Sequence, residues 1–402
     1  MRVAFLTPEH PSEYPDGGGL ASYVHRIARA MLDAGHEPEV FFPSRLASET
    51  CTYDGVQIHR VNAKQNHPVL RLLSGGSRRI IRNGAWNGVV QWLLQAKALA
   101  VALEARHDVA PFQLVQSADY LATGLFVRHL PDRQHVVRCS SAADLYRHAD
   151  QLGDLREICR EYLERRAIRR ANASYAPSRY IACHFRRIHN IDVRVVRPPA
   201  YWEVTSLPEP SIPLPARFFL HFGVLTERKG TAVLAAALPI AWEITPDLTM
   251  VWSGHCPDER QLKYWRSLWG SKASQVQITG PLSRPQLYAV LKRADAAVLP
   301  SQVDNLPNTV IESLVLGIPV LGSRGASIDE LIDEGKTGHL VPLGDAKGLG
   351  EALAMMWLKM SPVSKGFKWN SEVSHQMEPK RAVANLINFA GISKVLHSDL
   401  FS

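Results

Sequence analysis

Residues 300–334 read PSQVDNLPNTVIESLVLGIPVLGSRGASIDELIDE, and this pattern predicts a strand end, a tight turn and the start of a helix. Asp304 opens the turn, and Glu312 follows eight residues later in the predicted first turn of the helix. Carboxylates accept hydrogen bonds from hydroxyl groups, and a helix N-terminus offers N–H donors and partial positive charge to phosphates. The stretch therefore favours a ligand with hydroxyls at both ends and phosphates in the middle, such as a nucleotide sugar.

A purely structural interpretation competes with this one. Thr309 and Glu312 have the spacing of a capping box, in which a hydroxyl and a carboxylate satisfy the first turn of a helix. Asp304 is also a common type of turn residue. Taken alone, the stretch favours this structural interpretation, and the rest of the chain has to decide.

The bulk composition is that of an ordinary globular protein. At 402 residues the chain can form two domains, each with its own core. The sequence has no uncharged apolar run long enough for a membrane helix, and its N-terminus, MRVAFLTPEH, does not resemble a signal peptide. Five scattered cysteines without a C-x-x-C pair favour a reducing cytoplasm and disfavour a zinc site.

The net charge of +8 is concentrated in one half of the chain. Residues 1–197 hold 27 basic and 19 acidic side chains, whereas residues 198–402 hold 19 of each. The basic residues cluster at Arg78, Arg79 and Arg82 and again at Arg165, Arg166, Arg169 and Arg170. This asymmetry suggests that the first half faces an anionic ligand or surface. Glutamates interleave with the second cluster, so a solvated helix face explains that cluster equally well.

The first half begins with a strand, a glycine-rich loop, a helix and a second strand. Residues 2–7 are the first predicted strand, the loop PEHPSEYPDGGG follows, an amphipathic helix ends at Gly35, and residues 39–42 are the next strand. Further predicted elements of this half are a helix over 86–105 and strands over 114–116, 136–138 and 174–176.

Residues 197–215 contain six prolines and no regular period, which indicates a linker. The second half then alternates predicted strands over 218–222, 249–253, 276–279, 296–300 and 319–321 with helices over 230–240, 257–269, 285–293 and from Ile328 onward. We therefore predict two doubly wound, Rossmann-like parallel-sheet domains, 1–197 and 198–374. Ligands bind beyond the carboxyl ends of parallel strands, so the domains are expected to face a central cleft.

The candidate site residues all lie in loops that follow predicted strands. Such loops occur at 17–19, 138–143, 223–230, 253–256, 280–282 and 301–309. Gly17–Gly19 allow close backbone approach to an anion, and Arg228 and Lys229 can neutralise a diphosphate. Each segment alone has a structural alternative. These are a mobile loop for the three glycines, a solvated pair for Arg228 and Lys229, and a plain turn at Gly280. The convergence of six loops favours a site.

Several chemistries are disfavoured by the absence of their motifs. The sequence has no D-x-D, H-x-H or H-E-x-x-H pattern, so we expect no metal at the site. It also lacks G-x-S-x-G and a Walker A sequence, which disfavours an α/β-hydrolase and a P-loop kinase. Aromatic residues are sparse beside the basic clusters, so nucleic acid is not an expected partner.

The order of these motifs resembles the retaining GT-B glycosyltransferases of family 4, the glycosyl transferases group 1. The matching segments are G-x-L-x-x-R-K-G at 223–230, A-D-A-A-V-L-P-S at 294–301, D-N-L-P-N-T-V-I-E-S at 304–313, G-I-P-V-L-G-S at 317–323 and G-H-L-V at 338–341. The resemblance covers essentially the whole chain and is densest over 217–345. It implies a GT-B fold, an acceptor domain first, a donor domain second, and a C-terminal helix within 375–402 that packs back on the first domain.

The resemblance also implies a role for each candidate residue. Glu312 would hold the ribose hydroxyls, and Asp304 a sugar hydroxyl beside the N–H groups of Asn305 and Leu306. Arg228 and Lys229 would stabilise the leaving diphosphate. The remaining donor-binding residues would line the diphosphate and the base: Gly18, Gly19, Asn308, Thr309, Val310, Gly280 and Leu282.

The sequence departs from the family at three positions. The first carboxylate of the signature is Asp304 rather than the commoner glutamate, and Val224 stands where many members have arginine. Family members often carry a histidine on the acceptor loop. Here the matching segment offers Arg138, Ser140 and Ser141, which we take as the acceptor-binding candidates.

The expected activity is metal-independent, retaining transfer of a sugar from a UDP- or GDP-sugar to a hydroxyl of a glycan, lipid-linked or small-molecule acceptor. The nucleotide sugar is a co-substrate, and no other cofactor is expected. A GT-B-fold nucleotide-sugar epimerase and a non-catalytic sugar-binding relative remain as alternatives. We expect a cytoplasmic protein whose basic first half binds an anionic or lipid-linked acceptor, with peripheral contact at the inner face of the membrane as a further expectation.

Overall fold

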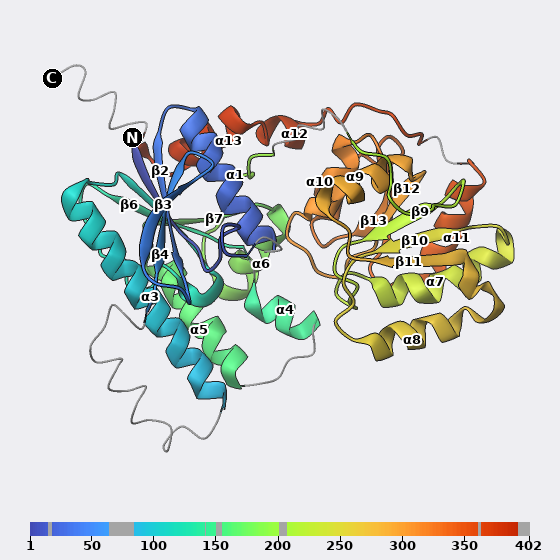
Figure 1. Ribbon diagram of the computed structural model, residues 1–402, viewed down its shortest axis with the longest axis horizontal. Coiled ribbons are helices and arrows are strands. Elements are labelled where there is room, and N and C mark those ends of the chain that lie inside the picture. The colour runs from blue at the N-terminus through green and yellow to red at the C-terminus, as the bar shows by residue number, and fades with distance from the viewer. Residues whose placement is uncertain are drawn as a thin grey trace. The chain divides into compact units, whose positions relative to one another are not determined.

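A computed structural model of the chain describes residues 1–14, 18–63, 84–140, 142–149, 155–200, 207–360 and 363–392. The chain forms two compact units, one of residues 1–201 with 375–402 and one of residues 202–374 (Figure 1). The division falls within the proline-rich stretch, four residues beyond the boundary predicted from sequence. No helix among the described residues is long and apolar enough to cross a bilayer.

Unit 1 is built on an eight-stranded sheet in the order β3-β4-β2-β1-β5-β6-β7-β8. Its strands are β1 (Arg2–Leu6), β2 (Glu37–Pro43), β3 (Glu49–Tyr53), β4 (Val56–Val61), β5 (Leu114–Ala118), β6 (Gln134–Arg138), β7 (Ala173–Ala176) and β8 (Arg194–Val195). β3 runs antiparallel to β4, and the other paired strands of the described sheet are parallel. The parallel strands of this sheet agree with the sequence prediction, because strands that alternate with helices form parallel sheets.

The helices of unit 1 cover this sheet. They are α1 (Gly19–Asp33), α3 (Gly84–Val109), α4 (Ala143–Ala149), α5 (Leu155–Arg170), α6 (Arg179–His189) and α13 (Pro379–Phe389), with a 3-10 turn, η2, at Tyr120–Ala122. The late helix α13 packs against α1, near the start of the chain (Figure 1). Its Val383 and Leu386 share a buried cluster with Val3 and Phe5 of β1, so the end of the chain completes the first core.

The hairpin of β3 and β4 was not predicted from sequence. Its turn is Asp54-Gly55, and both residues have left-handed backbone angles, with φ of 47° and 79°. Asp-Gly is a strong sequence signal for such a turn because these two residues tolerate positive φ well. The hairpin adds the antiparallel edge of the sheet.

Unit 2 is an all-parallel, six-stranded sheet in the order β11-β10-β9-β12-β13-β14. Its strands are β9 (Phe219–Phe222), β10 (Met250–Ser253), β11 (Val276–Gly280), β12 (Ala296–Leu299), β13 (Val320–Arg324) and β14 (Gly338–Pro342). Its helices are α7 (Thr231–Ile244), α8 (Glu259–Leu268), α9 (Arg284–Arg293), α10 (Asn308–Val315) and α11 (Ala346–Trp357), and α12 (Glu372–Gln376) lies where the chain passes to unit 1. The order reverses between β9 and β12, which is where a doubly wound fold binds its ligands.

The helix predicted from Ile328 onward is wrong. The structure has a single 3-10 turn, η4 (Ile328–Glu330), in its place. Ala326 and Ser327 before it have positive φ, and a second tight turn at Asp333 leads directly into β14. The chain between β13 and β14 is therefore too tightly bent to build a longer helix.

Each unit buries a histidine in its sheet. His135 of β6 contacts the hydroxyl of Ser117 at 2.9 Å, and burial lowers its pKa to about 3. His221 of β9 is also buried, and burial lowers its pKa to about 4. Both imidazoles are therefore neutral in the folded protein near pH 7.

These histidines predict that the protein loses stability in mild acid. An unfolded histidine has a pKa near 6.5, so below that pH the unfolded chain takes up protons that the folded chain excludes. The free energy of unfolding should fall by up to about 1.4 kcal/mol per pH unit for each histidine as the pH drops from 6.5 toward 4. Urea unfolding at pH 7.5, 6.0 and 5.0 measures this slope. His221→Asn should be less stable at pH 7.5 but have a shallower slope, and parallel curves for the two proteins would contradict the assignment.

Candidate functional site

The loops after β9, β10 and β11 are hydrogen-bonded to one another at one edge of the unit 2 sheet. The amide of Gly223 donates to Ser253 O at 3.0 Å, and that of Gly254 donates to Gly280 O at 2.9 Å. A Cβ atom at Gly254 would lie 1.7 Å from the carbonyl oxygen of Gly223. Only glycine fits there, so these loops meet through their backbones.

The Arg228-Lys229 turn is held against the loop that follows β12 by two contacts. Gln302 N donates to Arg228 O at 2.8 Å. A Cβ atom at Gly230 would lie 1.9 Å from Pro300 O, and Gly230 has a φ of +78°. The sequence predicted this loop as a site, and these contacts explain why it ends in glycine.

His221 fixes the start of the helix that follows this turn. Its Nδ1 lies 2.7 Å from Val298 O, and its Nε2 lies 3.0 Å from the hydroxyl of Thr231. A carbonyl oxygen can only accept, so the neutral imidazole carries its proton on Nδ1 and accepts from Thr231 at Nε2. Burial is the main cause of the lowered pKa of His221, and the positive charge of Lys229 lowers this pKa further. This buried histidine therefore ties the central strands of the sheet to the Lys229 loop.

Lys229 and Asp304 form an ion pair. Lys229 Nζ lies 2.6 Å from Asp304 Oδ2, and the two side chains are 23% and 10% exposed. Sequence analysis placed both residues in the site but did not predict that they pair. Because the pair is largely shielded from water, each charge depends on the other more than an exposed pair would.

The turn at Asn305 and Leu306 does not present its amides outward as predicted. Asn305 N donates to Asp304 Oδ1 at 3.0 Å, and Leu306 N donates to the Ser327 hydroxyl at 2.6 Å. Leu306 has a positive φ of 55°, and the Ser327 hydroxyl also lies 3.3 Å from Asp304 O. These two amides build the turn itself, so their predicted contact with a sugar is wrong for this conformation.

The start of α10 differs from the predicted capping box. Pro307 is the N-cap, and the first helical hydrogen bond runs from Ile311 N to Pro307 O. Glu312 therefore lies in the second turn, not the first, too far along to serve as the carboxylate of a capping box. The amides of Asn308, Thr309 and Val310 precede that first bond, in the positions where helix starts bind anions.

Glu312 is instead positioned by a neighbouring helix. Tyr288 of α9 donates its hydroxyl to Glu312 Oε1 at 3.1 Å, and the Glu312 residue is 8% exposed. Three residues before Glu312, the methyl group of Thr309 faces Gly223, where an added Cβ would lie 3.6 Å from it. The two ends of the predicted carboxylate signature thus lie on the same β12–α10 connection, beside the Gly223 loop.

The predicted base-binding turn ends β11. Gly280 has a φ of +71°, and its carbonyl oxygen accepts from Gly254 N and from the Thr279 hydroxyl. No atom lies within 4 Å of the position of an added Cβ at Gly280, and Leu282 is half-buried. Contact with a base stays a prediction for both residues.

The glycine loop of unit 1 already holds a carboxylate. Gly18 is the N-cap of α1, and both Gly18 and Gly19 are exposed. Glu9 Oε1 accepts from Ala21 N at 3.2 Å, so this side chain occupies part of the helix start where a phosphate was predicted. Gly17 lies outside the described residues.

Arg138 and Ser140, two of the predicted acceptor residues, belong to a polar network at the end of β6. Arg138 is 7% exposed, its guanidinium carbon lies 3.8 Å from the centre of the Tyr23 ring, and its Nη1 donates to Ser140 Oγ at 2.5 Å. Ser140 N donates to the buried Asp119 at 2.7 Å. Arg138 is thus a support for the loop, and Ser140 is its more accessible member. Ser141 lies outside the described residues.

Of the two basic clusters, the structure describes the one in α5. In α5 the interleaved glutamates form ion pairs, such as Arg165 with Glu161 at 3.4 Å and Arg160 with Glu157 at 2.6 Å. The alternative of a solvated helix face is only partly right, because Glu157, Glu161 and Glu164 are buried whereas Arg169 and Arg170 are exposed. Arg78, Arg79 and Arg82 lie outside the described residues.

Three supporting residues were missed from sequence. Ser327 follows β13, which neighbours β12, so its position at a strand end was a usable signal. Tyr288 and His221 gave none, because a tyrosine on a helix and a histidine in an apolar strand are common in protein cores. Each acts through a residue that the sequence did identify.

Comparisons with known families cover most of the chain. Residues 18–202 match the model of the glycosyl transferase 4-like domain, and residues 216–358 match that of the glycosyl transferases group 1. A phosphatidyl-myo-inositol mannosyltransferase of Mycobacterium leprae is 30% identical over 130 residues, 32% of this chain and 34% of that protein. The protein of the same name from Mycolicibacterium smegmatis is 24% identical over 88% of this chain and 84% of that protein. The first curated relatives are matched over only 21% to 34% of their lengths.

Solved structures show the same fold. Sucrose-phosphate synthase from Thermosynechococcus elongatus has a TM-score of 0.68 and 17% identity, over 100% of this chain and 99% of that one. Anabaena HepE, solved in complex with UDP and glucose, has a TM-score of 0.65 and 15% identity, over 96% and 98%. The predicted GT-B architecture of two parallel-sheet domains is confirmed.

The Gly230 contact predicts a large penalty for adding one methyl group. Gly230→Ala would place Cβ against Pro300 O and impose a strained φ, so we expect a loss of about 3 kcal/mol or more in unfolding free energy. Gly270→Ala is the matched control, because Gly270 also has a positive φ, 50°, but no atom within 4 Å of the added Cβ. That control should cost about 1 kcal/mol. Equal urea midpoints for the two variants would show that the close approach to Pro300 is unimportant.

Proposed function

The chain belongs to the group 1 glycosyltransferases of the GT-B fold, and from this we propose that it transfers a sugar from a nucleotide-sugar donor to an acceptor hydroxyl. The observation that carries the proposal is the Lys229–Asp304 pair beside the start of α10. A cation, a carboxylate and a helix N-terminus at one sheet edge suit a ligand that joins a diphosphate to hydroxyl-rich groups.

We assign the donor to unit 2. Glu312, held by Tyr288, accepts the ribose hydroxyls, and the amides of Thr309 and Val310 meet the diphosphate together with Arg228 and Lys229. Asp304 accepts a hydroxyl of the transferred sugar. A uridine diphosphate donor is favoured over a guanosine one because HepE is solved with UDP and glucose and a trehalose-6-phosphate synthase with UDP-2-fluoro glucose.

Donor binding exchanges the partner of Lys229. The diphosphate carries more negative charge than one carboxylate, so it competes for the ammonium group that Asp304 holds at 2.6 Å. As Lys229 turns to the diphosphate, Asp304 Oδ2 becomes available to accept from a sugar hydroxyl. Lys229 then has the diphosphate as its anionic partner, and Asp304 has the sugar hydroxyl as a hydrogen-bond donor, which limits the cost of the exchange in this shielded position.

The reaction needs positioning and charge stabilisation more than covalent help. The bond from the sugar anomeric carbon to the diphosphate oxygen breaks, and the acceptor oxygen forms the new bond on the same face. The acceptor proton leaves with the departing diphosphate, whose negative charge Lys229 and Arg228 stabilise. We also propose that the anomeric configuration is retained and that this step needs no metal.

The acceptor is assigned to unit 1, where Ser140 is the accessible residue of the β6 loop. The excess positive charge of residues 1–197 suits an anionic or lipid-linked acceptor and contact with an anionic membrane surface. Such binding would weaken as salt screens the charges.

A donor screen tests the proposed function. Thermal shift with UDP-, GDP-, ADP- and dTDP-sugars should give one stabilising nucleotide, with UDP expected. Glu312→Gln should weaken binding of that nucleotide by about tenfold, the value of one lost charge-assisted hydrogen bond, and leave pyrophosphate binding unchanged. Conversion of donor without acceptor would indicate an epimerase, and binding without transfer to any acceptor would indicate a non-catalytic relative.

Lys229 is the residue on which transfer should depend most. Lys229→Ala should lower the transfer rate by about 100-fold or more, the effect of removing one charge-stabilising donor. Lys347→Ala is the control, since that side chain on α11 is 79% exposed and should have no effect. Initial rates at saturating donor separate this from a loss of affinity. If Lys229→Ala transferred sugar at the wild-type rate, the leaving-group role would be wrong.

A further inference from the structure

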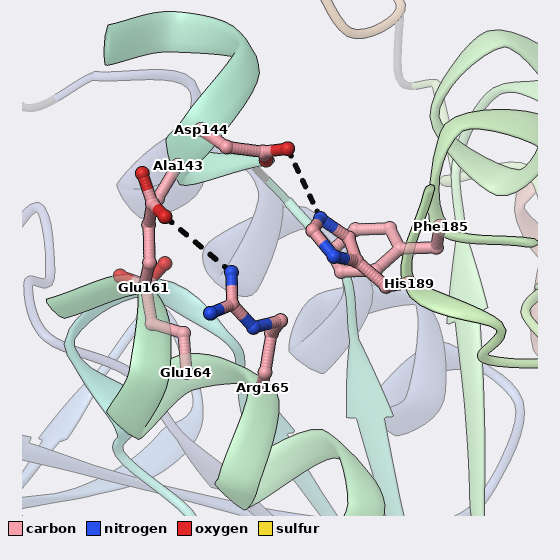
Figure 2. A pocket seen from close by; sticks show the side chains of 7 residues that line it. All are labelled: Ala143, Asp144, Glu161, Glu164, Arg165, Phe185 and His189. Carbon is pink, nitrogen blue, oxygen red and sulfur yellow. Dashed lines mark hydrogen bonds and ion pairs between the residues drawn. The ribbon is translucent and has the colours of Figure 1, made fainter. Parts of the chain in front are cut away.

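Three side chains that can bind a metal, one aspartate and two histidines, converge on one point in unit 1. Asp144 Oδ2 lies 2.8 Å from His184 Nε2 and 3.0 Å from His189 Nε2. One ligand atom from each of the three residues lies within 4.8 Å of the others. Figure 2 shows Asp144 extending from α4 toward His189 at the end of α6.

The local sequence holds the two histidines firmly. α6 begins at a capping serine, Ser178, whose hydroxyl accepts from Ile181 N at 3.2 Å, and it ends at Asn190 with left-handed backbone angles. Its buried face includes Phe185, whose ring centre lies 5.7 Å from that of His189. The histidine positions are therefore set by a well-capped, packed helix, and Asp144 is brought to them by α4.

We propose that Asp144, His184 and His189 bind a divalent transition-metal ion, with Zn²⁺ as the best match. Two imidazoles and one carboxylate oxygen are a common three-residue set for this ion, with water as the fourth ligand. Tetrahedral Zn²⁺ with bonds of about 2.0 Å places its ligand atoms about 3.3 Å apart. The measured 2.8 and 3.0 Å need to widen by only about half an ångström.

Metal binding replaces a hydrogen-bonded arrangement of the same atoms. With the ion absent, each Nε2 donates a proton to the shared carboxylate oxygen. The ion instead binds the lone pair of each Nε2, so each Nε2 must lose its proton. In a neutral imidazole this proton moves to Nδ1, whereas a charged imidazole releases it to water. The Asp144 carboxylate supplies negative charge in both arrangements.

A small, partly open pocket adjoins the cluster. Asp144 and His189 line it, together with Glu161 and Glu164 of α5, and Arg165 pairs with Glu161 at 3.4 Å (Figure 2). The pocket leaves one side of Asp144 and His189 open, with room for a water on the ion.

The site would act on the acceptor side of the molecule. α4 begins three residues after Ser140, and the ion would join it to α6, which lies 35 residues further along. It would thus fix one end of the loop that carries Ser140, without taking part in donor chemistry. Motif searches over short spacings could not find it, because Asp144 is 40 residues from His184.

Metal titration of the full chain, made without a histidine tag and stripped with chelator, tests the proposal. Isothermal titration with Zn²⁺ should show one ion per chain with a Kd of about 1 μM or tighter. Co²⁺ should give the visible absorption bands of a tetrahedral site, and Zn²⁺ should abolish them. His189→Gln should weaken Zn²⁺ binding by at least about tenfold.

The matched control is His25→Gln. His25 lies 3.4 Å from Asp54, and neither belongs to a group of three possible metal ligands among the described residues, so its replacement should leave titration and spectra unchanged. Hydrogen exchange supplies a second readout: Zn²⁺ should slow exchange of α4 amides in wild type and His25→Gln but not in folded His189→Gln. Absence of Zn²⁺ binding by the wild type, or equal binding by His189→Gln, would overturn the proposal.

Discussion

The candidate site depends on backbone approaches that only glycine permits. Gly254 lies against the carbonyl of Gly223, and Gly230 lies against that of Pro300. These contacts draw the loops after β9, β10 and β12 to one edge of the sheet, and Lys229 stands beside Asp304 because its neighbour Gly230 allows the turn to lie so close. A side chain at either glycine would separate the loops by more than a hydrogen-bond length.

The electrostatics of the site follow from this framework. Lys229 and Asp304 lie 2.6 Å apart and are mostly shielded from water, while His221 behind them stays neutral because burial lowers its pKa to about 4. A charged histidine there would repel Lys229. The framework therefore holds the Lys229–Asp304 pair at the sheet edge, where the ammonium group suits an anionic ligand.

The residues that the sequence identified share one property, which is that they follow strands. Asp304, Glu312 and Lys229 could be found because parallel strands bring their carboxyl ends together. Ser327 also follows a strand, but its hydrogen bond to Leu306 could not be predicted. Tyr288 could not be assigned at all, since its importance lies in a hydrogen bond to Glu312, and such pairings between distant segments leave no local pattern. The same limit applies to the Asp144 cluster.

Backbone conformations that adjacent turns impose could also not be predicted from the sequence. The Ile328 segment has helical composition, but the left-handed residues before it and the turn after it shorten the helix to η4. Thr309 and Glu312 have capping-box spacing, yet Pro307 ends the preceding turn and becomes the N-cap, which displaces both residues by two positions along the helix. In both places a tight turn overrides a local preference.

The shorter carboxylate at position 304 follows from the same geometry. Asp304 Oδ1 accepts from the next amide, Asn305 N, at 3.0 Å, while Oδ2 holds Lys229. A glutamate would carry its carboxylate one methylene further and could not close the same short ring to the Asn305 amide. Aspartate at this position therefore keeps the carboxylate close to the turn, with one oxygen committed to the backbone and one directed to the cation. A sugar hydroxyl bound by this carboxylate would have to reach that second oxygen.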